Sequence, residues 1–286
     1  MLQNHATLQQ IRFSLLQELR KIYPESESSS ILRLILDHAG YPSSVYLRDP
    51  DRVPGAATVA QINEFVSEIH RGKPIQYILG YTHFCDIKIS VNESVLIPRP
   101  ETEEMVHHII AQSSRAPDCI LDIGTGSGCI ALALKHQFSQ ATVHGFELSQ
   151  TALKVASENG LVTGLEVNWI EGDILNKFTW NTDSGYDLIV SNPPYVLNSE
   201  RAMMKINVLE FEPDEALFVE DSNPLLFYSA IAVFSMEQLN DNGKVWVEIN
   251  EQLGAETAYI FERAGFRHVT ILKDIHDKER FIRVEK

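Results

Sequence analysis

The feature that most constrains the fold of this sequence is an apolar run that ends in two consecutive prolines. Residues 187–191 read Asp-Leu-Ile-Val-Ser, and Asn192-Pro193-Pro194-Tyr195 follow at once. Because proline lacks a backbone N–H and has a fixed φ, two in a row can continue neither a helix nor a central strand ladder. The chain must therefore leave a sheet here as a stiff extended segment, at the strand end where open α/β sheets bind their ligands.

This segment carries groups that suit a planar nitrogen. The amide oxygen of Asn192 and the carbonyl of Pro193 can accept both hydrogens of an NH2 group, while the ring of Tyr195 stacks on its face. The alternative is an ordinary Pro-Pro turn in which Asn192 caps the next segment. The strand before it and a glycine-rich loop upstream favour a site. We expect Asn192, Pro193 and Tyr195 to be catalytic, and the substrate to be bound by Asn192, Pro193, Pro194 and Tyr195.

The glycine-rich loop follows a short apolar run at 120–123 and leads into a helix of small residues, as in nucleotide-binding βα units. Gly124 can adopt the φ > 0 turn, Gly126 lets the backbone approach a ligand, and Gly128 lets the helix pack on the strand. The spacing is G-x-G-x-G, which weakens a pyrophosphate interpretation, and a simple tight turn is the alternative. The loop residues expected to bind a cofactor are Gly124, Thr125, Gly126, Ser127 and Gly128.

Two acidic residues follow the next two expected strands. Glu147 lies 23 residues beyond the first glycine of the loop, close to the ~20 expected for a carboxylate that binds ribose hydroxyls. The alternative is an N-terminal helix charge beside a Ser149 cap. Asp173 follows a strand expected at 166–170 and can accept from an adenine amino group, although the spacing supports a solvated turn acid nearly as well.

In this order, the motifs resemble those of class I S-adenosylmethionine-dependent methyltransferases. The matching elements are residues 122–128, Glu147, Asp173 and the N-P-P-Y segment, which is typical of members that methylate amide or exocyclic amino nitrogens. Further segments narrow the resemblance to the release-factor protein-(glutamine-N5) methyltransferases, the PrmC/HemK family. These segments are residues 74–80, Phe84, residues 95–103 and residues 211–213.

The resemblance implies a Rossmann-like α/β class I methyltransferase sheet, mostly parallel with an antiparallel last strand, and a small N-terminal helical domain. It implies an enzyme that transfers methyl from S-adenosyl-L-methionine to the side-chain amide N5 of the glutamine in the Gly-Gly-Gln motif of peptide-chain release factors. Glu147 stands where Asp is usual, and Ile174 stands where some relatives have an aromatic residue. The implied cofactor-binding residues are Gly124, Thr125, Gly126, Ser127, Gly128, Glu147, Asp173 and Asn192.

The periodicity of the chain changes along its length. Apolar residues recur every three or four positions over residues 8–22, a second helix is expected at 30–38, and residues 58–61 form a capping-box pattern that opens a third. After residue 100, strands and helices alternate, which predicts a mainly parallel sheet. The expected parts are a helical substrate-recognition domain at 1–75, a β-hairpin linker at 76–99 and a methyltransferase domain at 100–286.

Composition restricts the partners. Acidic residues outnumber basic ones 39 to 24 for a net charge of −15, whereas a protein that grips DNA needs a basic footprint. We therefore expect that the protein does not read nucleic acid directly, and that its negative electrostatic field attracts a basic protein.

The three cysteines form no C-x-x-C pair, and we interpret them as reduced thiols. No apolar run approaches the ~20 residues that span a bilayer. We expect a cytoplasmic protein and, separately, a monomer.

No metal site is expected, because no metal-ligand spacing is apparent in the sequence. His107 and His108 are interpreted as helix-surface or packing residues.

Two other substrates remain open: the glutamine of a ribosomal protein, and adenine N6 in DNA, which would be flipped out of the duplex. A catalytically silent binding module on the same fold is a further alternative. A nicotinamide dehydrogenase is disfavoured by the glycine spacing and by the N-P-P-Y segment.

Overall fold

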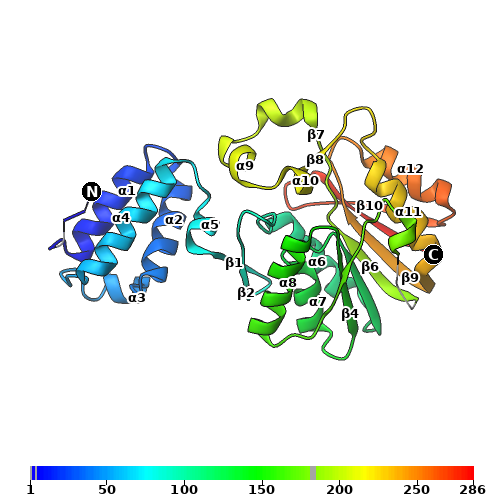
Figure 1. Ribbon diagram of the computed structural model, residues 1–286, viewed down its shortest axis with the longest axis horizontal. Coiled ribbons are helices and arrows are strands. Elements are labelled where there is room, and N and C mark those ends of the chain that lie inside the picture. Colours follow the sequence, from blue (N-terminus) through cyan, green and yellow to red (C-terminus); the bar gives the residue numbers. More distant parts are fainter. Residues whose placement is uncertain (1, 4, 181–184) are drawn as a thin grey trace. The chain divides into compact units, whose positions relative to one another are not determined.

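The structure is a computed structural model that describes residues 2–3, 5–180 and 185–286. The chain forms two compact units (Figure 1). One comprises Met1–Gly80 with Ile206–Phe211, and the other comprises Tyr81–Lys205 with Glu212–Lys286. The first unit is helical, and the second is built around a twisted sheet.

The helical unit buries one apolar face of each long helix. A capping box formed by Thr7 and Gln10 starts α1, and the periodic residues Leu8, Ile11 and Leu15 are almost wholly buried. Such burial of a helix stripe supplies most of the stability of a helix of this length. The helices are α1 (Leu8–Leu19), α2 (Glu25–His38), α3 (Ser43–Tyr46), α4 (Ala56–His70), α5 (Ile75–Leu79) and α9 (Ile206–Phe211).

Two helix starts predicted from the sequence are wrong. The second helix, α2, begins at Glu25 rather than near Ser30, because the hydroxyls of Ser29 and Ser30 donate to carbonyls one turn earlier and so do not interrupt the helix. The third, α4, begins at Ala56 with Gly55 as its N-cap, so the Thr58 pattern lies inside the helix. Two alanines, the strongest helix formers, extend it backwards.

A β-hairpin opens the second unit. Its strands are β1 (Tyr81–Phe84) and β2 (Ile87–Ser90), joined by a two-residue turn in which Cys85 and Asp86 have φ of 47° and 63°. Positive φ at both central residues is the geometry that fits the twist of a tight hairpin. Residues 76–79, expected in a hairpin linker, are part of α5, which ends at Gly80 with φ 79°.

Seven strands form the main sheet in the order β10-β11-β9-β6-β3-β4-β5. Five neighbouring strands of this sheet, β9, β6, β3, β4 and β5, pair in parallel. Strand β11 pairs antiparallel with both β9 and β10. The predicted fold, a mostly parallel Rossmann-like sheet with an antiparallel terminal pair, is therefore confirmed. The strands are β3 (Cys119–Ile123), β4 (Thr142–Glu147), β5 (Asn168–Glu171), β6 (Tyr186–Ser191), β9 (Leu239–Glu248), β10 (His268–Lys273) and β11 (Glu279–Glu285).

Helices cover both faces of this sheet. Figure 1 shows α7 (Cys129–Gln137) and α8 (Gln150–Thr163) on one face, and α11 (Leu226–Gln238) and α12 (Gly254–Ala264) on the other. Large side chains without solvent exposure, including Trp246, fill the layers between them. The remaining elements are α6 (Pro100–Gln112), η1 (Lys177–Thr179), β7 (Val196–Leu197), η2 (Asn198–Met203), α10 (Asp214–Leu217) and β8 (Phe218–Val219). No helix within the described ranges is both long and apolar enough to cross a membrane.

The register of the sheet decides which residues meet at its carboxyl edge. Ile123 of β3 lies opposite Phe146 of β4 and Ser191 of β6. Ser191 in turn lies opposite Val247 of β9. The residues that follow these strands, which the sequence places far apart, therefore share one edge.

Candidate functional site

A cavity of about 560 Å³ opens at this edge, within the second unit. Its walls come from the glycine loop, the ends of β4 and β6, the start of α6 and the segment around α10. Such a volume suits a cofactor-sized ligand. The sequence-predicted residues that line it are Gly124, Thr125, Gly126, Ser127, Glu147, Asp173, Asn192, Pro193 and Pro194.

Backbone conformation makes the glycine loop hard to substitute. Gly124 and Gly126 have φ of 71° and 54°, and a Cβ on either would meet no atom closer than 4.0 Å, so they bring bare backbone to the cavity wall. Gly128 has φ 81°, and its Cβ would lie 2.8 Å from the ring of Trp169. This third glycine therefore makes room for Trp169 of β5 and for Ala156 of α8, which would lie 3.2 Å from the same Cβ.

Glu147 holds the loop in place. One carboxylate oxygen accepts the N–H of Gly126 at 2.9 Å, and the other accepts the N–H of Ser149 at 3.0 Å. Each oxygen keeps a second lone pair for a ligand hydroxyl. Glu147 therefore supports the first turn of α8 and also lines the cavity, and its binding of ribose stays a prediction.

Asp173 is partly committed to its own turn. Its Oδ1 accepts the N–H of Leu175 at 2.8 Å, and its backbone N–H donates to the hydroxyl of Thr179 at 2.9 Å. Its neighbour Ile174, 9% exposed, supplies apolar surface to the same wall. The pair offers a carboxylate acceptor beside an aliphatic side chain, which suits the edge and face of a base.

Asp122, at the end of β3, is a wholly buried acid beneath the loop. Its Oδ2 accepts from the hydroxyl of Thr125 at 2.5 Å and from the N–H of Ala131 at 3.1 Å. Its Oδ1 has no hydrogen-bond partner among the described residues. Burial raises the pKa of this carboxyl to about 7, because removing the charged form from water outweighs its two hydrogen bonds. Asp122 thereby joins the loop to the start of α7.

Two side chains, Thr102 of α6 and Glu248 of β9, fix the orientation of Asn192. Its Nδ2 donates to Oγ1 of Thr102 at 2.9 Å, and Thr102 donates to Oε2 of Glu248 at 2.7 Å. Since a carboxylate can only accept, Thr102 must spend its one proton on Glu248 and accept from the Asn192 amide. The amide nitrogen therefore faces Thr102, and Oδ1 is left as an acceptor. We name these three residues the Thr102 bridge.

Glu248 is the buried end of the Thr102 bridge. It is 1% exposed, and burial raises its pKa above the ordinary range while the hydroxyls of Thr102 and Tyr195 and the guanidinium of Arg280 oppose that rise. Tyr195 donates to Oε1 at 2.8 Å. Hydrogen bonds to a desolvated carboxylate are among the stronger ones in proteins, so both partners of Glu248 are held firmly.

Tyr195 lies differently from the other residues of its segment. Its ring packs against the hydrophobic core, and its hydroxyl is taken by Glu248. Burial together with the nearby carboxylate raises its pKa well above the ordinary range. It does not belong to the described lining of the cavity, so its stacking on a substrate amide stays a prediction.

Two segments that carried the family resemblance meet in an ion pair. Nη2 of Arg99 donates to both oxygens of Glu212, at 2.7 and 2.8 Å, and the N–H of Ile97 donates to the same carboxylate at 3.2 Å. The Glu212 side chain is 1% exposed and that of Arg99 is 30% exposed. Arg99 and Pro213 both line the cavity, so the pair secures one of its walls.

Asn159 is a supporting residue that the sequence analysis missed. On α8 it is 1% exposed; its Nδ2 donates to the carbonyl of Ser127 at 2.9 Å, and its Oδ1 accepts the N–H of Ser90 at 2.8 Å. It thus fastens the glycine loop to the hairpin. A polar residue on the apolar face of the expected helix was the available signal. Thr102 and Glu248 gave no comparable signal, because their roles depend on tertiary contacts.

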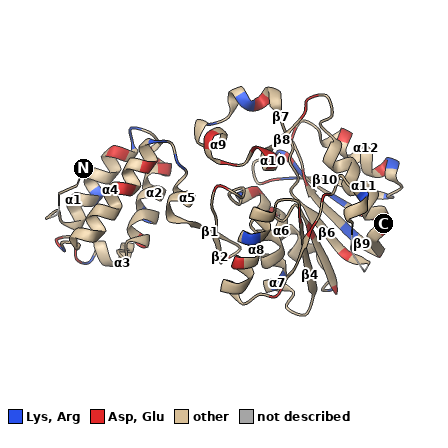
Figure 2. Cartoon of the chain, in the orientation of Figure 1, with Lys and Arg blue, Asp and Glu red and all other residues tan. Residues whose placement is uncertain are grey.

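Basic residues are spread over both units of the chain. Figure 2 shows Lys and Arg scattered over many elements of both units rather than gathered along one helix or strand. Many are paired with acids, as in the contacts of Arg201 with Asp214 and of Lys278 with Glu251. Within the part of the chain that the structure describes, no single element presents the basic stripe that a duplex reader requires.

Two family models match the two parts of the chain. The family model for a methyltransferase small domain matches residues 102–210, and that for the PrmC N-terminal domain matches residues 14–80. A solved methyltransferase from Pyrococcus furiosus has a TM-score of 0.50, covers 70% of this chain and 89% of its own, and is 18% identical. At that identity the likeness concerns the fold alone.

Two curated relatives match over almost their full length. The release factor glutamine methyltransferase of Flavobacterium psychrophilum is 40% identical over 278 residues, which cover 96% of this chain and 97% of that protein. The protein of the same name from Bacteroides thetaiotaomicron is 38% identical over 269 residues, which cover 93% and 95%. The matched lengths span both units, and the predicted family is confirmed: the chain belongs to the release factor glutamine methyltransferases.

Proposed function

We propose that this protein transfers the methyl group of S-adenosyl-L-methionine to the side-chain amide N5 of the glutamine in the Gly-Gly-Gln motif of peptide-chain release factors. The observation that carries the proposal is the Thr102 bridge, which turns the nitrogen of the Asn192 amide away and leaves its oxygen as an acceptor. The preceding strand end and two prolines hold this acceptor at the wall of a cofactor-sized cavity.

The residues of the cavity fit the cofactor. The bare backbone of the glycine loop leaves room for a close approach, Glu147 keeps lone pairs for ribose hydroxyls, and Asp173 with Ile174 suits an adenine edge and face. When bound, S-adenosylmethionine supplies a methyl group already activated on a sulfonium, so the protein needs neither a metal nor a strong base for the transfer.

The task of the protein is to present a weak nucleophile. An amide nitrogen donates poorly because its lone pair is delocalised into the carbonyl. Acceptors at Asn192 Oδ1 and the Pro193 carbonyl would hold both hydrogens of the glutamine NH2 and stabilise the positive charge that grows on nitrogen as it gains methyl. As the nitrogen–methyl bond forms, the methyl–sulfur bond would break, and one proton would pass from the nitrogen to the solvent. Holding the glutamine nitrogen in line with the methyl–sulfur bond lowers the activation free energy by an amount on the order of several kcal/mol, as positioning does in other enzymes.

The helical unit is the proposed contact for the release factor. It matches the PrmC N-terminal domain model and carries no residue of the cavity. The net charge of −15 favours a basic protein partner over nucleic acid. We infer a monomer that acts in the cytoplasm, where reduced cysteines such as buried Cys129 are stable.

Mass spectrometry tests the proposal directly. The enzyme and the cofactor are incubated in three separate reactions with purified release factor, with ribosomal protein and with adenine-containing DNA. We expect one added methyl on the Gly-Gly-Gln glutamine and none on a control factor with glutamate there, which has no amide nitrogen. Methylation of the ribosomal protein or of the DNA, with an unmodified factor, would overturn the substrate assignment.

A further inference from the structure

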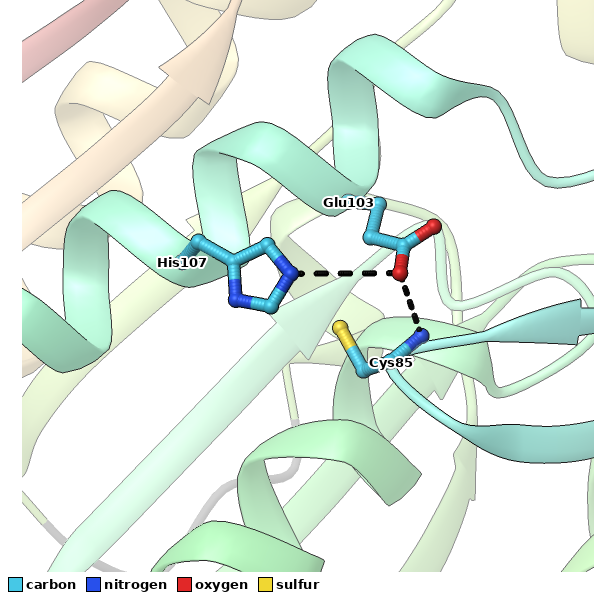
Figure 3. A group of neighbouring side chains, drawn as sticks. All are labelled: Cys85, Glu103 and His107. Carbon is cyan, nitrogen blue, oxygen red and sulfur yellow. Dashed lines mark hydrogen bonds and ion pairs between the residues drawn. The ribbon is translucent and has the colours of Figure 1, made fainter.

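A second cluster of side chains lies at the tip of the hairpin. Cys85 stands in the turn between β1 and β2, and Glu103 and His107 lie one turn apart on α6. Figure 3 shows the thiol, the carboxylate and the imidazole pointing toward one another. None of the three lines the cavity described above, so the proposed methyl transfer does not use them.

The geometry of the cluster is set by the backbone. The N–H of Cys85 donates to Oε1 of Glu103 at 2.9 Å, which ties the turn to α6, and Nε2 of His107 lies 3.8 Å from the same oxygen. One ligand atom from each residue lies within 4.8 Å of the other two. Zinc bonds of about 2.0–2.3 Å in a tetrahedron place neighbouring ligand atoms a little over 3 Å apart, so small side-chain rotations suffice to close the site.

We propose that Cys85, Glu103 and His107 bind a divalent metal ion of the zinc class. Thiolate, imidazole and carboxylate are the ligand types that zinc takes, and three protein ligands leave a fourth position for water. A sulfur ligand selects zinc or cobalt over magnesium and calcium. When Sγ coordinates, the Cys85 thiol releases its proton to the solvent.

The role inferred for the metal is structural. It would add a second fastening between the hairpin tip and α6, the helix that carries Thr102. Cys85 has a φ of 47°, which is uncommon for a residue other than glycine. Its side chain points from the turn toward Glu103 and His107 (Figure 3). No metal-ligand spacing is apparent in the sequence, because Cys85 and Glu103 are brought together only where the hairpin packs against α6.

The same helix supplies an internal control. His108 and Glu104 form an equivalent pair four residues apart, with 3.5 Å between Nε2 and the carboxylate, but no cysteine belongs to it among the described residues. Without a thiol the pair is an ordinary side-chain contact four residues apart on a helix, and the His108 ring also packs against Trp246 and Phe281. Any metal binding that depends on the cluster should therefore require His107 and not His108.

Cobalt titration of the untagged, chelator-treated full chain tests the proposal. We expect a thiolate-to-cobalt charge-transfer absorption that saturates at one ion per chain, is displaced by zinc and is absent in Cys85→Ser. His107→Ala should weaken cobalt binding at least about tenfold. Even the loss of a residue that only hydrogen-bonds to a metal ligand typically weakens metal binding by about that factor. His108→Gln should leave it unchanged.

Circular dichroism of each variant confirms folding, and zinc should raise the thermal midpoint of the parent but not of Cys85→Ser. A charge-transfer band that survives Cys85→Ser would assign the metal to another thiol and overturn the proposal. So would the absence of any band at millimolar cobalt in the folded parent. Equal losses in His107→Ala and His108→Gln would also contradict it.

Discussion

Replacing Thr102 with valine removes the central hydroxyl of the Thr102 bridge and leaves the shape of the side chain almost unchanged. The Asn192 amide then loses the acceptor at 2.9 Å that holds its nitrogen, and Glu248 loses a donor at 2.7 Å. Without that constraint the amide can turn its nitrogen toward the substrate, where a donor repels the hydrogens of the glutamine NH2. We expect turnover to fall while the cofactor still binds.

The magnitude follows from the hydrogen bonds. An amide-to-hydroxyl hydrogen bond contributes about 0.5–1.5 kcal/mol net, and one to a charged group about 1.5–3 kcal/mol. If about 1–2 kcal/mol of this preference for one amide orientation is lost, kcat falls about 5- to 30-fold. Leaving the buried carboxylate with one donor fewer should also lower the free energy of unfolding by about 1–3 kcal/mol.

Steady-state methylation of a release factor, with calorimetry of cofactor binding, measures both parts. Thr102→Ser keeps the hydroxyl and should retain most of the kcat, which separates orientation from packing. Thr257→Val is the matched control: this threonine is 0% exposed and its hydroxyl has no partner among the described residues. A Thr102→Val enzyme with the kcat of the parent, or a kcat loss shared by Thr257→Val, would refute the reasoning.

Three further changes test the support of the cofactor loop. Because burial raises the pKa of Asp122 to about 7 from 3.8, its stabilising contribution is full below pH 3.8 and is lost as the pH rises through 7. Urea unfolding should therefore show Asp122→Asn gaining on the parent by at most about 1.4 kcal/mol per pH unit between pH 5 and 7; a constant difference contradicts this. Gly128→Ala places a Cβ 2.8 Å from Trp169 at φ 81° and should cost about 2–4 kcal/mol of unfolding free energy; a loss below about 1 kcal/mol would show that the loop adapts. Asn159→Leu frees the Ser127 carbonyl and should raise the cofactor Kd about 2- to 10-fold in calorimetry, with an unchanged Kd as the contrary result.

Patterns local in sequence predicted the fold well. Strand ends before the glycine loop and before Asn192 were visible because apolar runs stop at residues that cannot continue a ladder. The mainly parallel sheet followed from the alternation of strands and helices, and the antiparallel terminal pair followed from the family resemblance; the strand pairing confirms both. Helix starts were less reliable, because serines that bond within α2 resemble a loop in sequence.

The support of the site could not be predicted in the same way. The hydrogen bond between Asn192 and Thr102 joins residues 90 positions apart in the sequence, and the one between Arg99 and Glu212 joins residues 113 positions apart. These contacts arise only when α6 packs beside the carboxyl ends of β6 and β9, which no periodicity encodes. The resemblance marked the segments that contain Thr102 and Glu212 but assigned Thr102 no role. The position of Tyr195, drawn into the core by Glu248, likewise required the packed structure.

Single-turnover methylation by Asn192→Ala, measured beside cofactor binding, tests the central claim most directly. Alanine removes the acceptor that is proposed to hold the glutamine NH2, whereas Asn192→Asp keeps an oxygen at that position. We predict that Asn192→Ala binds cofactor nearly as the parent does but transfers no detectable methyl to the release factor, and that Asn192→Asp retains measurable transfer. Transfer at the parental rate by Asn192→Ala would contradict the account.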